Sequence, residues 1–116
     1  MLDLAKRLIA IPSENPPENH YEECACTLFD ELVRLGFDEV RREGACVLAS
    51  VGTGPRTLYF SGHYDVVPAQ GRDQIQPRVK GANLCGRGSS DMKGGLAAII
   101  HGGPRRATKG FSRPAV

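Results

Sequence analysis

The sequence predicts an α/β fold, because helix-type and strand-type patterns follow one another along its 116 residues. Two segments near the start place apolar residues at the spacing of amphipathic helices. Three short strand-type runs follow at 37–42, 46–51 and 57–60. A third apolar helical pattern begins at Gly94. This order of elements is typical of an α/β arrangement.

The first two helices are predicted from their apolar faces and from the residues at their ends. Pro12 ends the first helix. Asn19 and Glu22 resemble a capping box at the start of the second helix, and Gly36 is its stop. We expect the apolar faces to lie in the core. Their residues are Leu2, Ala5, Leu8 and Ile9 in the first helix, and Cys24, Ala25, Leu28, Leu32 and Leu35 in the second.

The last of the three strand-type runs leads directly to a candidate functional residue. Thr57–Phe60 predicts a short buried strand, and Ser61 and Gly62 close it. His63 therefore stands at the carboxyl end of a strand. In open α/β sheets, ligands bind beyond the carboxyl ends of the strands, so the position of His63 suits a binding site.

A hairpin and a third helix are the remaining predicted elements. Arg78–Lys80 and Asn83–Cys85 predict the hairpin, with the Gly-Ala pair between them as its turn. The helix is expected to stop at the Gly-Gly-Pro sequence of 102–104. Residues 102–116 carry basic but no acidic side chains and show no apolar period. We therefore expect a disordered basic tail after a partial metal-binding domain at residues 1–101.

His63, Asp65 and Asp91 are the candidate site residues. In extended backbone, His63 and Asp65 project to one side while the residues between and after them project to the other. A metal-binding imidazole usually has its second nitrogen held by a carboxylate or carbonyl, which Asp65 can supply. Asp91 lies among glycines, which allow a tight turn. Imidazole nitrogen and carboxylate oxygen together suit a divalent cation, so we expect the three side chains to converge.

Each of these three residues is also compatible with a purely structural role. His63 alone could be a hydrogen-bonded structural histidine, and both aspartates could cap turns. The Gly-rich segment could bind phosphate, but Asp91 stands where a dinucleotide fingerprint needs glycine. Lys93 is followed by Gly94, where a phosphate-binding loop of the Walker type needs Ser or Thr. The remaining histidines are expected on the surface; they are His20 and His101.

Composition sets limits on partners and location. Fifteen Lys and Arg against thirteen Asp and Glu give a net charge of +2, which favours neither nucleic acid nor an anionic membrane as a partner. No apolar stretch is long enough to span a membrane. The four cysteines form no C-x-x-C pair, which indicates reduced thiols in a cytoplasmic protein. The length allows one domain at most.

Three motifs resemble those of a known family. The segments G-H-Y-D-V-V-P at 62–68 and G-R-G-S-S-D-M-K-G-G at 86–95, together with I-P-S-E-N-P-P at 11–17, resemble the dizinc metallopeptidase and deacylase family. That family includes acetylornithine deacetylase, succinyl-diaminopimelate desuccinylase and aminoacylase. The resemblance implies the N-terminal part of a zinc-exopeptidase-like catalytic domain, truncated, with a mixed sheet and flanking helices.

The resemblance also implies a role for each site residue. His63 would bind one zinc ion, Asp91 would bridge two, and Asp65 would be the catalytic-site aspartate that orients His63. The peptide bond after Asp91 would be cis. Cobalt or manganese could replace zinc. The general-base glutamate and the other metal ligands of the family have no counterpart among these residues.

The function implied by the resemblance is hydrolysis of amide bonds in N-acyl amino acids or small peptides. Because the ligand set is incomplete, we expect this chain alone to be inactive. The alternative is a non-catalytic remnant or interaction module that keeps the N-terminal half of the fold. A complete set of metal ligands would distinguish the two.

Overall fold

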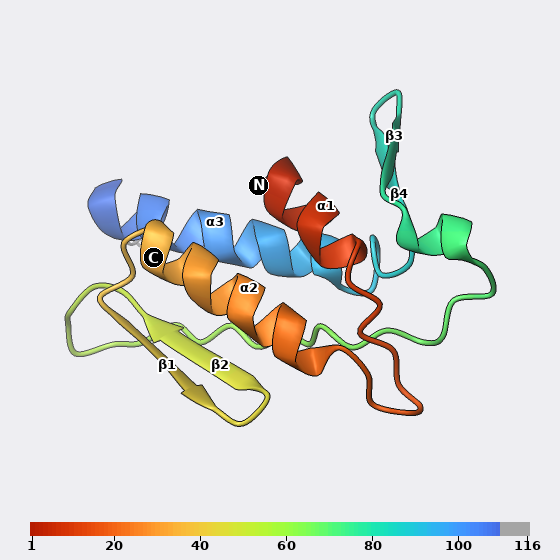
Figure 1. Ribbon diagram of the computed structural model, residues 1–116. Helices are drawn as coiled ribbons and strands as arrows, with labels where there is room; N and C mark the ends of the chain where they lie inside the picture. Colours follow the sequence, from red (N-terminus) through yellow and green to blue (C-terminus); the bar gives the residue numbers. More distant parts are fainter. Residues whose placement is uncertain (110–116) are drawn as a thin grey trace.

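The protein is described from a computed structural model, which places the backbone of residues 1–109 and the side chains of residues 1–103. This part of the chain is a small α/β structure with three α-helices and two pairs of antiparallel strands (Figure 1). The helices are α1 (Leu2–Ile9), α2 (Tyr21–Arg34) and α3 (Lys93–Lys109). The strands are β1 (Glu39–Glu43), β2 (Cys46–Ser50), β3 (Arg78–Lys80) and β4 (Asn83–Cys85), and a short 3-10 helix spans Arg72–Ile75.

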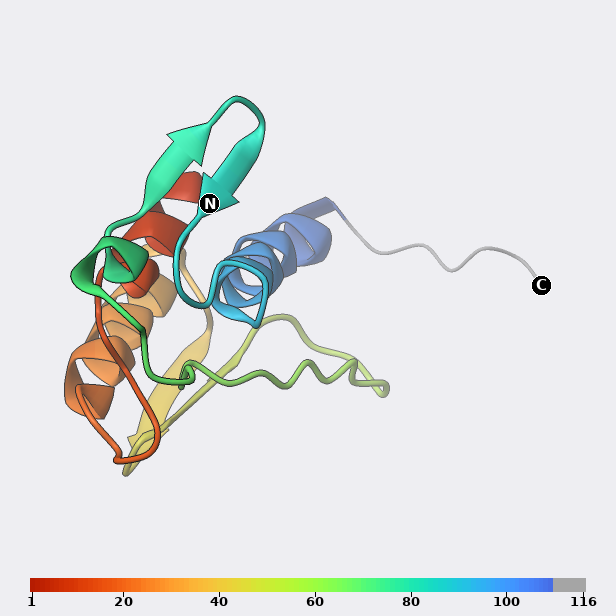
Figure 2. The same ribbon diagram turned by 90° about the vertical axis from the view of Figure 1, so that its right-hand side faces the viewer.

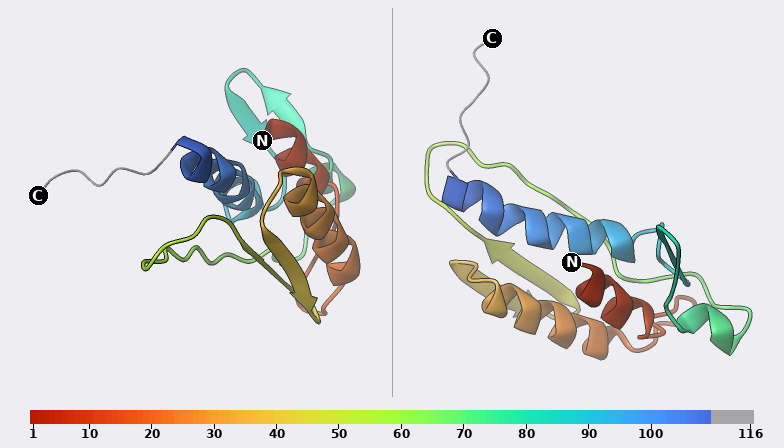
Figure 3. Two further views of the ribbon diagram at one scale, coloured as in Figure 1. Left: turned by 90° about the vertical axis from the view of Figure 1, so that its left-hand side faces the viewer. Right: turned by 90° about the horizontal axis from the view of Figure 1, so that it is seen from above.

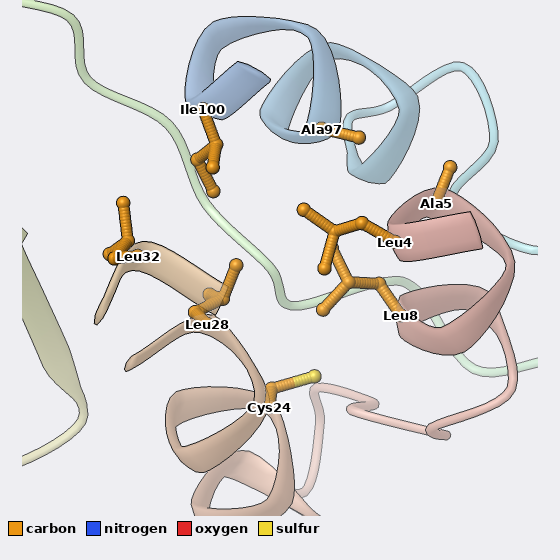
Figure 4. Packing of buried hydrophobic residues seen from close by; sticks show 8 residues of the cluster. All are labelled: Leu4, Ala5, Leu8, Cys24, Leu28, Leu32, Ala97 and Ile100. Carbon is orange, nitrogen blue, oxygen red and sulfur yellow. The ribbon is translucent and has the colours of Figure 1, made fainter. Parts of the chain in front are cut away.

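The core lies where the three helices meet. Seen from above, α1 lies between α2 and the first turns of α3 (Figure 3, right). Figure 4 shows how apolar side chains from all three helices point toward one another: Leu4, Ala5 and Leu8 from α1, Cys24, Leu28 and Leu32 from α2, and Ala97 and Ile100 from α3. This cluster confirms the predicted stripe of α2. In α1 the predicted Ala5, Leu8 and Ile9 are buried, but Leu4 takes the place of the predicted Leu2, which is half exposed. Side chains lean toward the helix N-terminus, so Leu2 leans past the end of α1.

The start of α2 differs from the predicted capping box. The helix begins one residue later than Asn19 and Glu22 require, so His20 is the N-cap, and no side chain caps the helix. His20 adopts a left-handed φ of 53°, and its Nδ1 lies 2.9 Å from Glu23 Oε1. The residues that occupy the cap and third helical positions are therefore His20 and Glu23. The acidic first turn, which favours a helix start, is present as predicted.

The strands predicted on either side of Gly44 and the hairpin predicted around Gly81 are both confirmed, but they do not join into one sheet. β1 pairs with β2 in antiparallel register from Glu39↔Ser50 to Glu43↔Cys46, and β3 pairs with β4. Gly44 and Gly81, with φ of 60° each, provide the turns. The pairs form separate two-stranded sheets, so the predicted mixed sheet is not found in the described part of the chain.

The predicted buried strand at Thr57–Phe60 is wrong. This segment is unpaired, and Leu58 and Tyr59 are 75% and 86% exposed. A strand needs a neighbour that accepts and donates its backbone hydrogen bonds, and the described residues place none beside it. In Figure 2 the chain after β2 runs out to one side and returns below α3. His63 comes to the start of that helix, where its backbone N lies 3.4 Å from Met92 Sδ.

The third helix extends further than predicted. α3 runs through the Gly-Gly pair at 102–103 to Lys109, where the sequence predicted a stop. Phe37 lies against Gly103, and a β-carbon there would come within 3.2 Å of the Phe37 ring. Packing against this ring offsets the weak helix propensity of glycine. Residues 110–116 of the predicted tail lie outside the described residues. No helix of the described chain is long and apolar enough to cross a membrane.

A buried carboxylate, Glu31, links the three helices electrostatically. The Glu31 side chain is only 3% exposed. Arg34 donates to it from the same helix, Arg7 Nη2 donates from α1 at 2.7 Å, and His101 Nε2 of α3 lies 3.2 Å away. His101, which was predicted at the surface, is only 20% exposed because it lies against Glu31. Hydrogen bonds from Arg34, opposed by burial and assisted by Arg7, lower the pKa of Glu31 from 4.5 to about 2.

We expect Glu31→Gln to lower the free energy of unfolding at neutral pH by about 1–3 kcal/mol, because it weakens charge-assisted hydrogen bonds. Asp30→Asn is the control, since Asp30 is exposed on the same helix. A carboxylate whose pKa is lowered by folding stabilises the fold at every pH above its pKa in the unfolded state. This stabilisation is lost as the pH falls through its pKa in the folded state. The Glu31 contribution should therefore be complete above pH 4.5 and disappear toward pH 2. Chemical denaturation at several pH values measures it; equal losses in both variants would contradict the prediction.

Candidate metal centre

The structure brings His63, Asp65 and Asp91 together, as predicted. His63 Nδ1 lies 3.0 Å from Asp65 Oδ1 and 3.1 Å from the Asp65 backbone oxygen. His63 Nε2 lies 3.1 Å from Asp91 Oδ1, although the two residues are 28 positions apart. The imidazole thus has a carboxylate at each nitrogen. It is 47% exposed, and Asp91 is 86% exposed, so the group faces solvent.

The alternation of an extended backbone determines which side chains of this segment face outward. Tyr64 and Val66 project away from His63 and Asp65, as the period of two requires. The Tyr64 hydroxyl donates to the Ala45 backbone oxygen at 2.6 Å, and Val66 is buried. These contacts on the inner side leave the His63 and Asp65 side chains on the outer side.

The loop after α1 holds this segment in place. Ser13, which is fully buried, donates from Oγ to the Tyr64 backbone oxygen at 2.7 Å. Val66 N donates to the Ser13 backbone oxygen at 2.9 Å, and Asn15 N donates to the Val66 oxygen at 2.9 Å. Glu14 Oε2 accepts a hydrogen bond from Ala69 N at 2.7 Å. Backbone pairing with residues 13–15 therefore fixes the direction in which His63 and Asp65 point.

A tight turn presents Asp91 at the start of α3. Lys93 N donates to the Gly88 backbone oxygen at 2.7 Å, which closes the turn. Gly88 has a φ of 88°, and a β-carbon there would lie 2.7 Å from Val66 and 3.1 Å from Lys93. Glycine is required at this position both for its conformation and for this close approach. The peptide bond between Asp91 and Met92 is cis, as the family resemblance implied.

Two pKa values near the site are shifted, that of His63 by its neighbouring oxygens and that of Lys93 by burial. Burial lowers the pKa of His63, but the backbone oxygen and carboxylate of Asp65 and the carboxylate of Asp91 outweigh it, so the net shift is upward. Burial lowers the pKa of Lys93, two residues after Asp91. Lys93 has no exposed surface, and its Nζ donates to the backbone oxygens of Leu8 and Ile11, each at 2.7 Å.

The donors present fit part of a zinc site. Two ligands of one tetrahedral zinc ion lie about 3.4 Å apart, given bonds of about 2.1 Å. The separation of 3.1 Å between His63 Nε2 and Asp91 Oδ1 is close to this value. Among the described residues, no group of three or more His, Cys, Asp or Glu side chains is arranged to hold a metal ion. His63 and Asp91 therefore form a pair of donors and not a complete coordination shell.

Sequence reasoning did not identify Ser13, Glu14 and Lys93 as parts of this arrangement. Serine and glutamate in a Pro-rich loop usually indicate an exposed turn, and lysine is rarely buried. The one available signal was position, because Lys93 falls inside the same Gly-rich motif as Asp91.

A concave surface of the chain lies away from these residues, at the base of the β3–β4 hairpin, and it is lined by residues that include Asp73, Arg78 and Arg87.

An imidazole beside one carboxylate, with a second carboxylate behind the imidazole, is an arrangement that can contribute ligands to a divalent cation. Comparison with known proteins adds a family likeness. Residues 59–114 match the pattern of the peptidase family M20/M25/M40. The matched segment contains all three candidate site residues.

Several desuccinylases are similar to this chain. Succinyl-diaminopimelate desuccinylase of Buchnera aphidicola subsp. Acyrthosiphon pisum (strain Tuc7) is 40% identical over 116 residues, covering 92% of this chain and 30% of that protein. The enzyme of the same name from Bordetella avium is 38% identical, covering 86% of this chain and 28% of its own length. The enzyme of the same name from Sphingopyxis alaskensis is 35% identical, covering 85% of this chain and 29% of its own length. The chain thus spans less than a third of these curated relatives.

Gly88→Ala should lower the free energy of unfolding by about 2–4 kcal/mol, because a left-handed φ and overpacking against Val66 add together. Gly81→Ala is a matched control: its φ is also positive, but nothing lies within 4 Å of the added carbon. It should lose only about 1–2 kcal/mol, from the backbone strain. Denaturant unfolding of both variants provides the comparison. Equal losses would show that Val66 moves aside freely.

Proposed function

We propose that this chain supplies the His63–Asp91 donor pair of a metal-dependent amide hydrolase acting on N-acyl amino acids or small peptides. The observation that carries the proposal is the imidazole held between two carboxylates, with Nε2 next to Asp91. The match of residues 59–114 to the peptidase family M20/M25/M40 supports the hydrolase type. The name of the similar desuccinylases supports an N-succinyl amino acid as the first substrate to test.

Asp65 determines which nitrogen of His63 is available as a ligand. In the neutral ring, a proton on Nδ1 is donated to the Asp65 carboxylate and backbone oxygen. This tautomer leaves the lone pair of Nε2 directed toward the Asp91 side. Asp65 also raises the basicity of the imidazole, which strengthens it as a ligand. We therefore propose that Asp65 orients His63 and that His63 and Asp91 bind the ion.

Zinc is the ion that this pair suits, and cobalt or manganese would accept the same nitrogen and oxygen donors. When bound, such an ion polarises an amide carbonyl and lowers the pKa of water. His63 and Asp91 hold it at an open face, where both side chains are accessible to substrate. Among the described residues no group of three or more His, Cys, Asp or Glu side chains is arranged to hold a metal ion, so the proposal assigns this chain two metal donors only.

The 116-residue chain should bind zinc weakly. The His63→Ala and Asp91→Ala variants should not bind it, because each substitution leaves one donor of the pair. His20→Ala is the control, since His20 is a histidine that pairs with Glu23 and not with the three site residues. Isothermal titration calorimetry of the four proteins measures the affinities. Binding that survives in both site variants would refute the proposed ligands. A chain that binds no zinc would favour an interaction module.

The zinc-loaded chain should release no amino acid from N-succinyl-diaminopimelate or N-acetyl amino acids. Loss of a general base alone costs about 10²–10⁴ in rate. A colorimetric assay for free amino groups, run with and without zinc, provides the test. Turnover that disappears in His63→Ala and Asp91→Ala, and persists in His20→Ala, would show instead that the short chain assembles a working site.

A further inference from the structure

We propose that the segment 8–15, here called the junction, sets the separation of His63 and Asp91, and that Lys93 and Ser13 are the positioning residues through which it acts. The inference rests on the proposed function, because it assigns these residues to the metal site. The hydrogen bonds of both side chains go to backbone oxygens and not to His63 or Asp91. Each acts through the backbone of the segment that carries one donor.

Lys93 connects the Asp91 turn to the junction. Its ammonium donates to the backbone oxygens of Leu8 and Ile11, both at 2.7 Å, with no exposed surface. These oxygens lie at the C-terminal end of α1, where a cation is favourable. A buried apolar side chain of similar length would fill the same space at lower cost in desolvation. Lysine differs from an apolar side chain in its hydrogen bonds to the end of α1. These bonds fix the distance between α1 and position 93, which is two residues after Asp91.

Ser13 connects the His63 segment to the same junction. Its hydroxyl donates to the backbone oxygen of Tyr64, the residue between His63 and Asp65. Its backbone oxygen accepts from Val66 N at 2.9 Å. The side chain is fully buried, so no water replaces this hydrogen bond. The segment that carries His63 is therefore held against the junction by two hydrogen bonds, one at Tyr64 and one at Val66.

The two connections meet at one atom. The Ile11 backbone oxygen accepts from Lys93 Nζ at 2.7 Å and from Ser13 N at 2.8 Å. The segments 62–68 and 86–95 share one direct hydrogen bond besides the His63–Asp91 pair in the described chain. It runs from His63 N to Met92 Sδ at 3.4 Å, and sulfur is a weak acceptor. The two motifs also pack directly, with Val66 against Gly88. The short hydrogen bonds that hold each of them go to the junction, and the proposal assigns the 3.1 Å separation of His63 Nε2 and Asp91 Oδ1 to those bonds.

Lys93→Met and Ser13→Ala test the inference without removing a metal donor. Each should lower zinc affinity by about 10- to 100-fold, the usual effect of losing a group that orients a ligand. The matched controls are Lys80→Met and Ser90→Ala, which remove the same chemical groups from exposed positions, Ser90 being next to Asp91. Both controls should bind zinc like the unaltered chain, and Ser13→Thr, which keeps the hydroxyl, should recover part of the affinity.

A second measurement needs no metal. The NMR signals of the His63 ring and the Asp91 carboxyl carbon report how the two groups lie in the metal-free chain. Ser13→Ala should shift mainly the His63 signals, and Lys93→Met mainly those of Asp91. Leu28→Ala removes apolar volume from the core and no hydrogen bond to the junction, so it should lower stability and leave both sets unchanged.

These readouts separate the inference from the proposed function. A chain that binds no zinc, but shows the expected NMR shifts, would refute the metal site and retain the junction. Unchanged signals and unchanged zinc affinity in Lys93→Met and Ser13→Ala would overturn the junction. NMR shifts of the His63 and Asp91 signals that are equally large in Leu28→Ala would overturn the junction as well. If Lys93→Met does not fold, Ser13→Ala against Ser90→Ala decides the question.

Discussion

The Ile11 backbone oxygen, shared by the Lys93 ammonium and the Ser13 amide, is the contact on which the arrangement of the chain depends. An ammonium without exposed surface must be hydrogen-bonded, because burying it unpaired would cost about 5 kcal/mol. Its partners lie at the end of α1. The packing of α1 against α3 therefore fixes the turn before α3, and the loop after α1 fixes the extended segment that leads from His63.

Buried and exposed polar groups have different tasks in this chain. Glu31, Ser13 and Lys93 are buried, and each joins elements that are distant in sequence. His63 and Asp91 are exposed, and their side chains pair with one another and with Asp65. The first set holds the helices and the loop after α1 in place, and the second lies at the surface, where a ligand can reach it. A rigid scaffold behind an open pair of donors is the arrangement that a metal ligand pair requires.

The predictions made from sequence hold where local pattern decides the structure and fail where distant partners decide it. The α2 stripe, both strand pairs and the convergence of His63, Asp65 and Asp91 followed from periodicity, turn residues and motif order. Thr57–Phe60 has strand composition but no neighbour among the described residues, so composition alone misled. Lys93 is buried against backbone oxygens, and His101 is partly buried beside Glu31; both sets of partners are far away in sequence. Pattern analysis has no access to such contacts.

A crystal structure of the chain soaked with zinc, with anomalous data collected at the zinc edge, tests most directly whether His63 and Asp91 bind one ion together. We expect an anomalous peak within about 2.0–2.2 Å of both His63 Nε2 and Asp91 Oδ1, with Asp65 still hydrogen-bonded to Nδ1. A peak at the cysteines or at His20 and Glu23, with His63 and Asp91 left without metal, would contradict the shared site.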